Sequence, residues 1–95
     1  MTAKPWSVRL LREAVEDFAA LDAAVTERVE RKLRWLAERA DEVVDARLHG
    51  DLAGLSKLRV GPWRVLYERV TEERLLLVYA VGHRREIYDL ASGRR

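Results

Sequence analysis

The 95-residue sequence has no cysteine, only two histidines, and no apolar run long enough to cross a membrane. Without cysteine, no disulfide can staple the fold and no thiolate can hold a metal ion. His49 and His83 lie too far apart in the sequence to form a zinc motif. The longest apolar run, residues 75–81, is far shorter than the roughly 20 residues of a spanning helix, and we find no signal-peptide core. We therefore expect one cytoplasmic domain over residues 1–95, with no metal and no other cofactor.

Hydrophobic residues make up 48% of the chain, which is enough for one modest core. Charge is divided unevenly between the two halves. Residues 1–45 contain 8 Lys and Arg against 10 Asp and Glu, whereas residues 46–95 contain 10 against 6. The basic second half favours a polyanion or an acidic protein as the partner.

Hydrophobic periodicity divides the chain into helical and extended segments. Val25, Val29, Leu33 and Leu36 recur at helical spacing, and the sequence after residue 54 alternates apolar and polar residues as strands do. The expected elements are a strand at 5–10, helices at 12–21 and 23–39, a turn near 43–48, and strands at 55–60, 63–70, 75–81 and 85–88. The order β-α-α-β-β-β-β predicts an α+β fold, in which an N-terminal helical hairpin packs on a mainly antiparallel sheet.

The predicted strands would sort their side chains onto two faces. With Val65 and Tyr67 facing the helices, alternation leaves Lys57, Arg59 and Arg64 on an open face of two adjacent strands. Exposed cations of this kind are most often ordinary solvated residues. The segment 83–88 is less easily explained in that way, because it packs a histidine, two arginines and a tyrosine into six residues. It would join the patch only if the strand order brings it alongside.

These residue types suit chemistry on RNA that needs no metal. RNA carries its own nucleophile, the 2′-hydroxyl, so a site must align it, remove its proton, stabilise the phosphorane and protonate the leaving 5′-oxygen. Arginine suits the phosphate, because its planar fork matches two phosphate oxygens. Lysine, histidine or tyrosine could move the protons.

Three motifs occur in order along the chain. Segments 48–50, 58–67 and 81–88 read LHG, LRVGPWRVLY and VGHRREIY. With the order of the elements, they resemble the RelE/ParE toxin superfamily of bacterial toxin–antitoxin modules, over essentially the whole chain. The resemblance implies a RelE-like toxin that cleaves mRNA in the ribosomal A site as a metal-independent endoribonuclease, and so inhibits translation. It also implies a RelB-like antitoxin as the partner, beside mRNA on the ribosome.

The resemblance further implies a role for each matching residue. Lys57 matches a basic catalytic position, Arg64 the arginine that stabilises the transition-state phosphate, Arg84 the general acid, and Tyr88 the tyrosine that orients or deprotonates the 2′-hydroxyl. We expect Arg59, His83 and Arg85, from the same motifs, to bind RNA. A second lysine of some RelE members is replaced here by Leu55, which rules out proton abstraction at that position.

The superfamily has a second branch. ParE-like members inhibit DNA gyrase by protein–protein binding and lack the residues that cleave RNA. The departure at Leu55 leaves this alternative open.

Overall fold

The computed structural model describes residues 4–95. Within them, five strands and three α-helices follow one another as β1 (Ser7–Leu10), α1 (Arg12–Ala19), α2 (Ala23–Glu38), β2 (Ala46–Arg47), β3 (Ser56–Val60), β4 (Trp63–Val70), β5 (Leu75–His83) and α3 (Ile87–Gly93). Two 3-10 turns, η1 (Gly50–Leu52) and η2 (Thr71–Glu73), connect them. No helix in the described part has the length and apolar composition needed to cross a bilayer.

The strands form one mixed sheet in the order β1-β5-β4-β3-β2. Strand β1 runs parallel to β5, and the other three pairs are antiparallel, so the mainly antiparallel sheet is confirmed. The apolar run 75–81 lies inside β5, which has a neighbour on each side. The loop expected to turn near residues 43–48 also contributes the two-residue edge strand β2, paired to Ser56 and Lys57.

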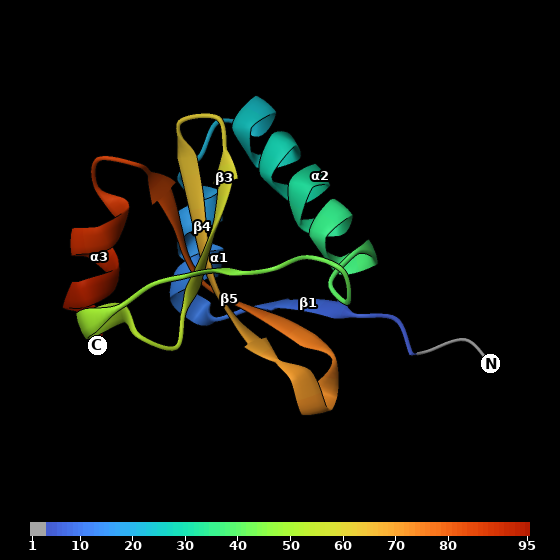
Figure 1. Cartoon of the computed structure of the whole chain (residues 1–95). Helices are drawn as coiled ribbons and strands as arrows, with labels where there is room; N and C mark the ends of the chain where they lie inside the picture. Colours follow the sequence, from blue (N-terminus) through green and yellow to red (C-terminus); the bar gives the residue numbers. More distant parts are fainter. Residues whose placement is uncertain (1–3) are drawn as a thin grey trace.

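The predicted helical hairpin covers one face of the sheet (Figure 1). The buried stripe of α2 consists of Val29, Leu33 and Leu36, three of the four residues that its periodicity predicted, while Val25 is only half-buried. This stripe packs with Val65 and Tyr67 of β4 in the main hydrophobic core. Full burial of an aliphatic or aromatic side chain contributes roughly 1.5–3 kcal/mol, so this layer dominates the stability of the domain.

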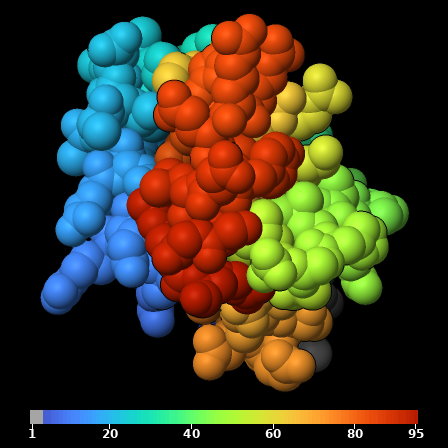
Figure 2. Space-filling view, turned by 90° about the vertical axis from the view of Figure 1, so that its left-hand side faces the viewer, coloured from blue at the N-terminus to red at the C-terminus, as the bar shows by residue number. Residues whose placement is uncertain are grey.

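The other face carries a second, smaller layer, and here the prediction was wrong. Residues 85–88 were expected to form a last strand, but the chain turns at 84–86 and continues as helix α3. Ile87 and Ala91, one helical turn apart, are both fully buried against Leu66 and Ala80. The helix therefore lies over the sheet, between α1 and the 46–55 segment (Figure 2). The α+β class is unchanged, but the second sheet face is not fully open.

Candidate functional site

Two of the three motif segments, 58–67 and 81–88, meet at one end of the sheet, whereas His49 of the 48–50 segment lines a hollow with Asp41 and Arg69 near the other end. Arg59 of β3 is in register with Arg64 of β4, and Arg64 is in register with Gly82 of β5. The Arg84 amide donates a hydrogen bond to the Pro62 carbonyl (2.9 Å), which joins the β3–β4 turn to the turn before α3. The strand order thus brings the 83–88 segment beside β3 and β4. This meets the condition under which the segment was expected to join the basic patch.

Lys57, Arg59 and Arg64 share one face, as alternation predicted. Their cross-strand partners place them on the side of Leu66, which packs under α3, and away from the face of Val65, which packs under α1 and α2. Arg59 is exposed and Lys57 is half-buried.

Arg64 is not an open-face residue, and this expectation was wrong. Only 7% of Arg64 is exposed. Its Nη1 atom donates to the carbonyl oxygens of Gly61 and Trp63, at 2.8 Å each. One corner of the guanidinium thus supports the β3–β4 turn, and the buried side chain holds a fixed position.

His83 points away from Lys57, Arg59 and Arg64. It pairs with Trp63, and the two rings meet edge to face with centroids 5.5 Å apart. Trp63 packs at the margin of the main core, on the α1 and α2 face. His83 Nδ1 also accepts a hydrogen bond from the Arg85 amide (3.3 Å). The structure therefore places His83 at the same end of the sheet as Arg64 but on the other face, in a turn-supporting position.

Tyr88 lies in the first turn of α3, half-buried against the second hydrophobic cluster. Among residues 4–95, no hydrogen-bond partner is seen for its hydroxyl, and no buried polar side-chain atom is left unsatisfied. The phenol ring is thus held by packing while its oxygen stays available. Arg84 and Arg85, just before the helix, are both exposed.

The cations of this group have no carboxylate partners within the described residues. The ion pairs seen there involve other basic residues, namely Arg31, Arg39, Arg69, Arg74 and Arg94. Lys57, Arg59, Arg64, Arg84 and Arg85 therefore keep their charge available for an external anion. In residues 4–95, no three His, Asp or Glu side chains are arranged to hold a metal ion.

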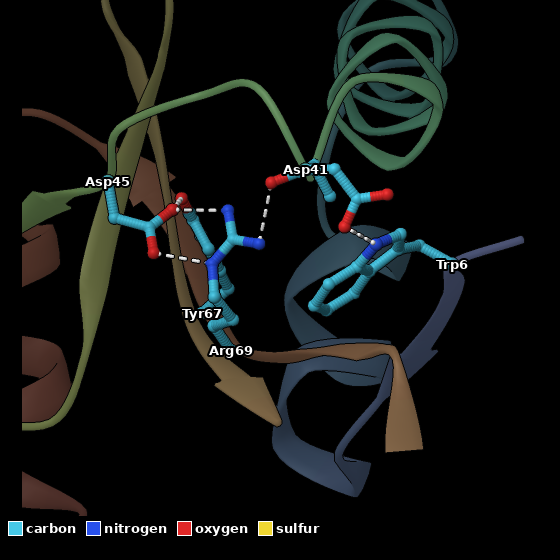
Figure 3. Close-up of polar contacts among 6 residues, drawn as sticks. Trp6, Asp41, Asp45, Tyr67 and Arg69 are labelled. Carbon is cyan, nitrogen blue, oxygen red and sulfur yellow. Dashed lines mark hydrogen bonds and ion pairs between the residues drawn. The ribbon is translucent and has the colours of Figure 1, made fainter. Parts of the chain in front are cut away.

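Polar networks at the opposite end of the sheet were not predicted from the sequence (Figure 3). Arg69 donates to both oxygens of Asp45 (2.6 and 2.8 Å) and to the Ala40 carbonyl (2.8 Å), and the Tyr67 hydroxyl donates to Asp45 at 2.6 Å. These hydrogen bonds, led by that from Arg69, hold the pKa of Asp45 below its usual value. Burial, followed by the hydrogen bond to Asp45, raises the pKa of Tyr67. Tyr67, the tyrosine of the 58–67 motif, therefore connects the 40–45 loop to β4.

Arginines directly after α3 hold that helix in place. Arg94 donates to both oxygens of Asp17 in α1 (2.7 and 2.9 Å), and Asp17 also accepts from the Val81 amide of β5 (3.0 Å). Arg95 donates to the carbonyls of Asp51 and Ala53 (3.1 and 2.9 Å). No sequence pattern flagged these residues, because each anchor joins positions that are distant in the chain.

Comparison with known proteins gives one consistent result. Residues 8–88 match the family model described as the ParE toxin of the type II toxin–antitoxin system parDE. A protein of Escherichia coli described as a RelE-like toxin is 29% identical over 93 residues, which cover 94% of this chain and 96% of the relative.

Solved structures agree with that match. The toxin–antitoxin complex RelBE2 of Mycobacterium tuberculosis is similar with a TM-score of 0.74 and 26% identity, over 83% of this chain and 91% of that one. A free mutant of the Escherichia coli toxin RelE has the same fold, with a TM-score of 0.73 at 23% identity over 96% and 98% of the two chains. The family match spans most of the sequence and includes the three motifs, so the chain belongs to the ParE toxin family of type II toxin–antitoxin systems, among the RelE/ParE toxins.

Proposed function

We propose that this toxin is a metal-independent endoribonuclease that cleaves mRNA in the ribosomal A site. The observation that supports the proposal is that cations without a carboxylate partner in the described chain come together at one end of the sheet, next to the turn from which α3 and Tyr88 begin. Arg59, Arg64 and Arg84 come together there through strand register and the Arg84–Pro62 hydrogen bond. Such a group suits a phosphodiester that gains negative charge in the transition state.

Each residue has a role that follows from its position. Arg64 is held rigidly, so its remaining N–H groups can bind the non-bridging phosphate oxygens without reorganising. Tyr88 or Lys57 takes the proton of the 2′-hydroxyl, which attacks the phosphorus and forms a 2′,3′-cyclic phosphate. Arg84, on the exposed turn, protonates or stabilises the leaving 5′-oxygen. DNA lacks the 2′-hydroxyl and would not be cleaved.

The proposed protein partner is a RelB-like antitoxin. Related toxins have been solved in complex with RelB, including those of Escherichia coli and Pyrococcus horikoshii. A toxin that degrades cellular mRNA must be held inactive in its own cell. Expression of this chain without an antitoxin is therefore expected to arrest bacterial growth, and co-expression with its antitoxin to restore it.

The second candidate is inhibition of DNA gyrase, which the match to the ParE family model favours. In that case the exposed cations would contact a protein surface instead of RNA, and Tyr88 would have no proton to move.

Primer extension on a translated mRNA separates the two candidates. Position-specific cuts that depend on the toxin, with gyrase supercoiling unaffected, are the expected result. Intact mRNA together with inhibited supercoiling would reject RNA cleavage in favour of the gyrase function.

A further inference from the structure

A basic groove lies next to the candidate site, between α2 and the β3–β4 turn. It has a volume of about 360 Å³ and is lined chiefly by Arg28, Arg31, Lys32, Trp35, Arg59 and Gly61. A second, mainly apolar hollow of about 270 Å³ continues along the same seam, with Lys32, Trp35 and Arg59 shared between the two, and reaches Lys57. We call the two together the α2–β3 groove.

The helix supplies its side of the groove from a single face. Counted from Arg28, the other three residues follow after three, four and seven positions, as Arg31, Lys32 and Trp35. This spacing places all four along one side of α2. Arg31 makes a surface ion pair with Glu27 (3.0 Å). Arg28 and Lys32 have no carboxylate partner in the described part of the chain. Apart from that of Arg31, the positive charge that α2 brings to the groove is therefore not neutralised within the described fold.

The β3–β4 turn is shaped to admit Arg28. Gly61 has a φ of +60°, and a Cβ atom built there would lie 2.7 Å from Arg28 Nη2. A residue with a side chain at this position would be strained and would push the guanidinium away. The glycine thus allows Arg28 to lie against the turn, next to the strand that carries Arg64.

Trp35 adds an aromatic surface beside these cations. It is 37% exposed, and two cations lie over its ring, Lys32 Nζ at 4.0 Å and Arg39 Cζ at 5.3 Å from the centroid. Cations beside an exposed aromatic ring are the combination by which proteins hold single-stranded nucleic acid, through phosphate contacts and base stacking.

Arg59 joins the groove to the candidate site. It is in register with Arg64, and the residue also lines both hollows from the edge of β3. Strand β2 pairs only with Ser56 and Lys57, so the rest of the β3 edge is left facing α2. A strand of RNA that leaves the candidate site past Arg59 would pass around this unpaired edge of β3 to reach the α2–β3 groove on the other face.

We propose that the α2–β3 groove binds the single-stranded RNA that flanks the cleaved phosphate, with Arg28, Lys32 and Arg59 on phosphates and Trp35 stacked on a base. The proposal rests on the proposed function, since it extends the same substrate beyond the reacting bond. It assigns to α2 a binding role separate from the chemistry of Lys57, Arg64, Arg84 and Tyr88.

The test compares two double variants that remove the same charge. Arg28→Gln with Lys32→Gln neutralises the groove, whereas Arg12→Gln with Arg34→Gln neutralises exposed cations that do not line it. The probe is a short single-stranded RNA with 2′-O-methyl groups, which binds but cannot be cleaved. Its affinity is measured over a range of salt concentrations, and melting temperatures confirm that all variants are folded.

The groove variant should bind roughly tenfold more weakly at low salt, with the slope of log K against log salt reduced by about 1.4, or about 0.7 for each lost phosphate contact. The control should bind like the wild type. Equal weakening by both variants, or an unchanged slope in the groove variant, would overturn the proposal. So would a groove variant that keeps RNA affinity but loses gyrase or antitoxin binding, because the groove would then be a protein contact.

Cleavage of unmodified mRNA is scored separately. At saturating RNA, the groove variant should retain the wild-type single-turnover rate, and loss of that rate without loss of affinity would also overturn the binding role. A wild-type protein that binds the methylated RNA through the groove but cleaves no mRNA would reject the proposed function alone.

Discussion

Tyr88 is the residue at which packing and chemistry can be separated most cleanly. Its ring packs against the second hydrophobic cluster, while its hydroxyl has no partner within the described residues. Tyr88→Phe keeps the ring and removes only the oxygen. We expect wild-type stability, retained RNA binding and a cleavage rate lower by roughly 10²–10⁴-fold, the usual contribution of one acid–base group.

Single-turnover cleavage of a ribosome-bound message measures this effect, and thermal melting of the same preparation checks the fold. An unchanged rate would remove Tyr88 from the chemistry and leave Lys57 as the base. Growth arrest that persists in Tyr88→Phe without any RNA cleavage would instead support the gyrase function.

Arg64 behaves differently, because its guanidinium serves the fold as well as the proposed site. Arg64→Ala removes the hydrogen bonds to the Gly61 and Trp63 carbonyls. We expect a loss of about 1.5–3 kcal/mol in the free energy of unfolding, the range for hydrogen bonds to a charged group, together with loss of cleavage. Denaturant unfolding measures the first effect. Arg84→Ala, on the exposed turn, is the comparison: it should lose cleavage while its stability stays within about 0.5 kcal/mol of the wild type.

Sequence reasoning identified which side chains share a face but not how deeply they are buried. Period-two alternation correctly grouped Lys57, Arg59 and Arg64, since register is fixed once Val65 faces the core. It could not predict that Arg64 is buried or that His83 turns toward Trp63. Both depend on how α3 and the two turns cover the end of the sheet, and no local pattern encodes that.

At the scale of elements, α3 is the part of the fold that the sequence analysis missed. The segment 85–88 was interpreted as a strand by itself, over four residues. The informative pattern is longer: Ile87 and Ala91 are one helical turn apart, and both are buried. Gly82 permits their close approach, because a Cβ atom there would lie 3.3 Å from the Ile87 side chain. A seven-residue helix has little stability of its own, so tertiary contacts decide its conformation.

Those tertiary contacts can be tested through Arg94. Both members of the Arg94–Asp17 ion pair are largely buried, with side chains 17% and 11% exposed. Arg94→Gln leaves the Asp17 carboxylate with only the Val81 amide as a partner. We expect a loss of about 1–3 kcal/mol in stability and faster hydrogen exchange of the α3 amides, with lower RNA cleavage because Tyr88 is no longer held in place.

Arg39→Gln is the matched control, since Arg39 pairs with Glu38 only on the surface. It should leave the exchange of the α3 amides unchanged. If α3 amides in Arg94→Gln exchange as slowly as in the wild type, the hydrophobic contacts of Ile87 and Ala91 alone hold the helix.

At the scale of the whole molecule, the polar network around Asp45 sets how stability depends on pH. Hydrogen bonds from Arg69 and Tyr67 lower the pKa of Asp45 in the folded state below its ordinary value of 3.8. The stabilisation from a carboxylate with a lowered pKa is present above the unfolded pKa and is lost as pH falls through the folded pKa. We therefore expect the domain to lose stability below about pH 4.

Asp45→Asn keeps the size of the side chain and removes its charge. Near neutral pH it should lower the free energy of unfolding by about 1–3 kcal/mol, and its stability should change less between pH 4 and pH 2 than that of the wild type. Urea unfolding over this pH range measures both quantities. Parallel pH curves for the two proteins would show that other carboxylates dominate acid unfolding.

The class and layer arrangement of the domain were predictable, since a helical hairpin followed by strands has few ways to bury its apolar faces. The parallel pairing of β1 with β5 was not, because it joins residues about seventy positions apart and leaves no mark on either segment alone.

That pairing also determines when the toxin can acquire its structure during synthesis. Strand β5 lies between β1 and β4, so until it leaves the ribosome β1 has no neighbour and the sheet cannot close. Arg84 and Tyr88 follow β5 in the chain and so emerge after it. A nascent chain that has emerged only as far as β4 thus lacks both the closed core and half of the proposed site. Under the proposed function, the chain therefore cannot cleave RNA until β5 and the segment that carries Arg84 and Tyr88 have been synthesised.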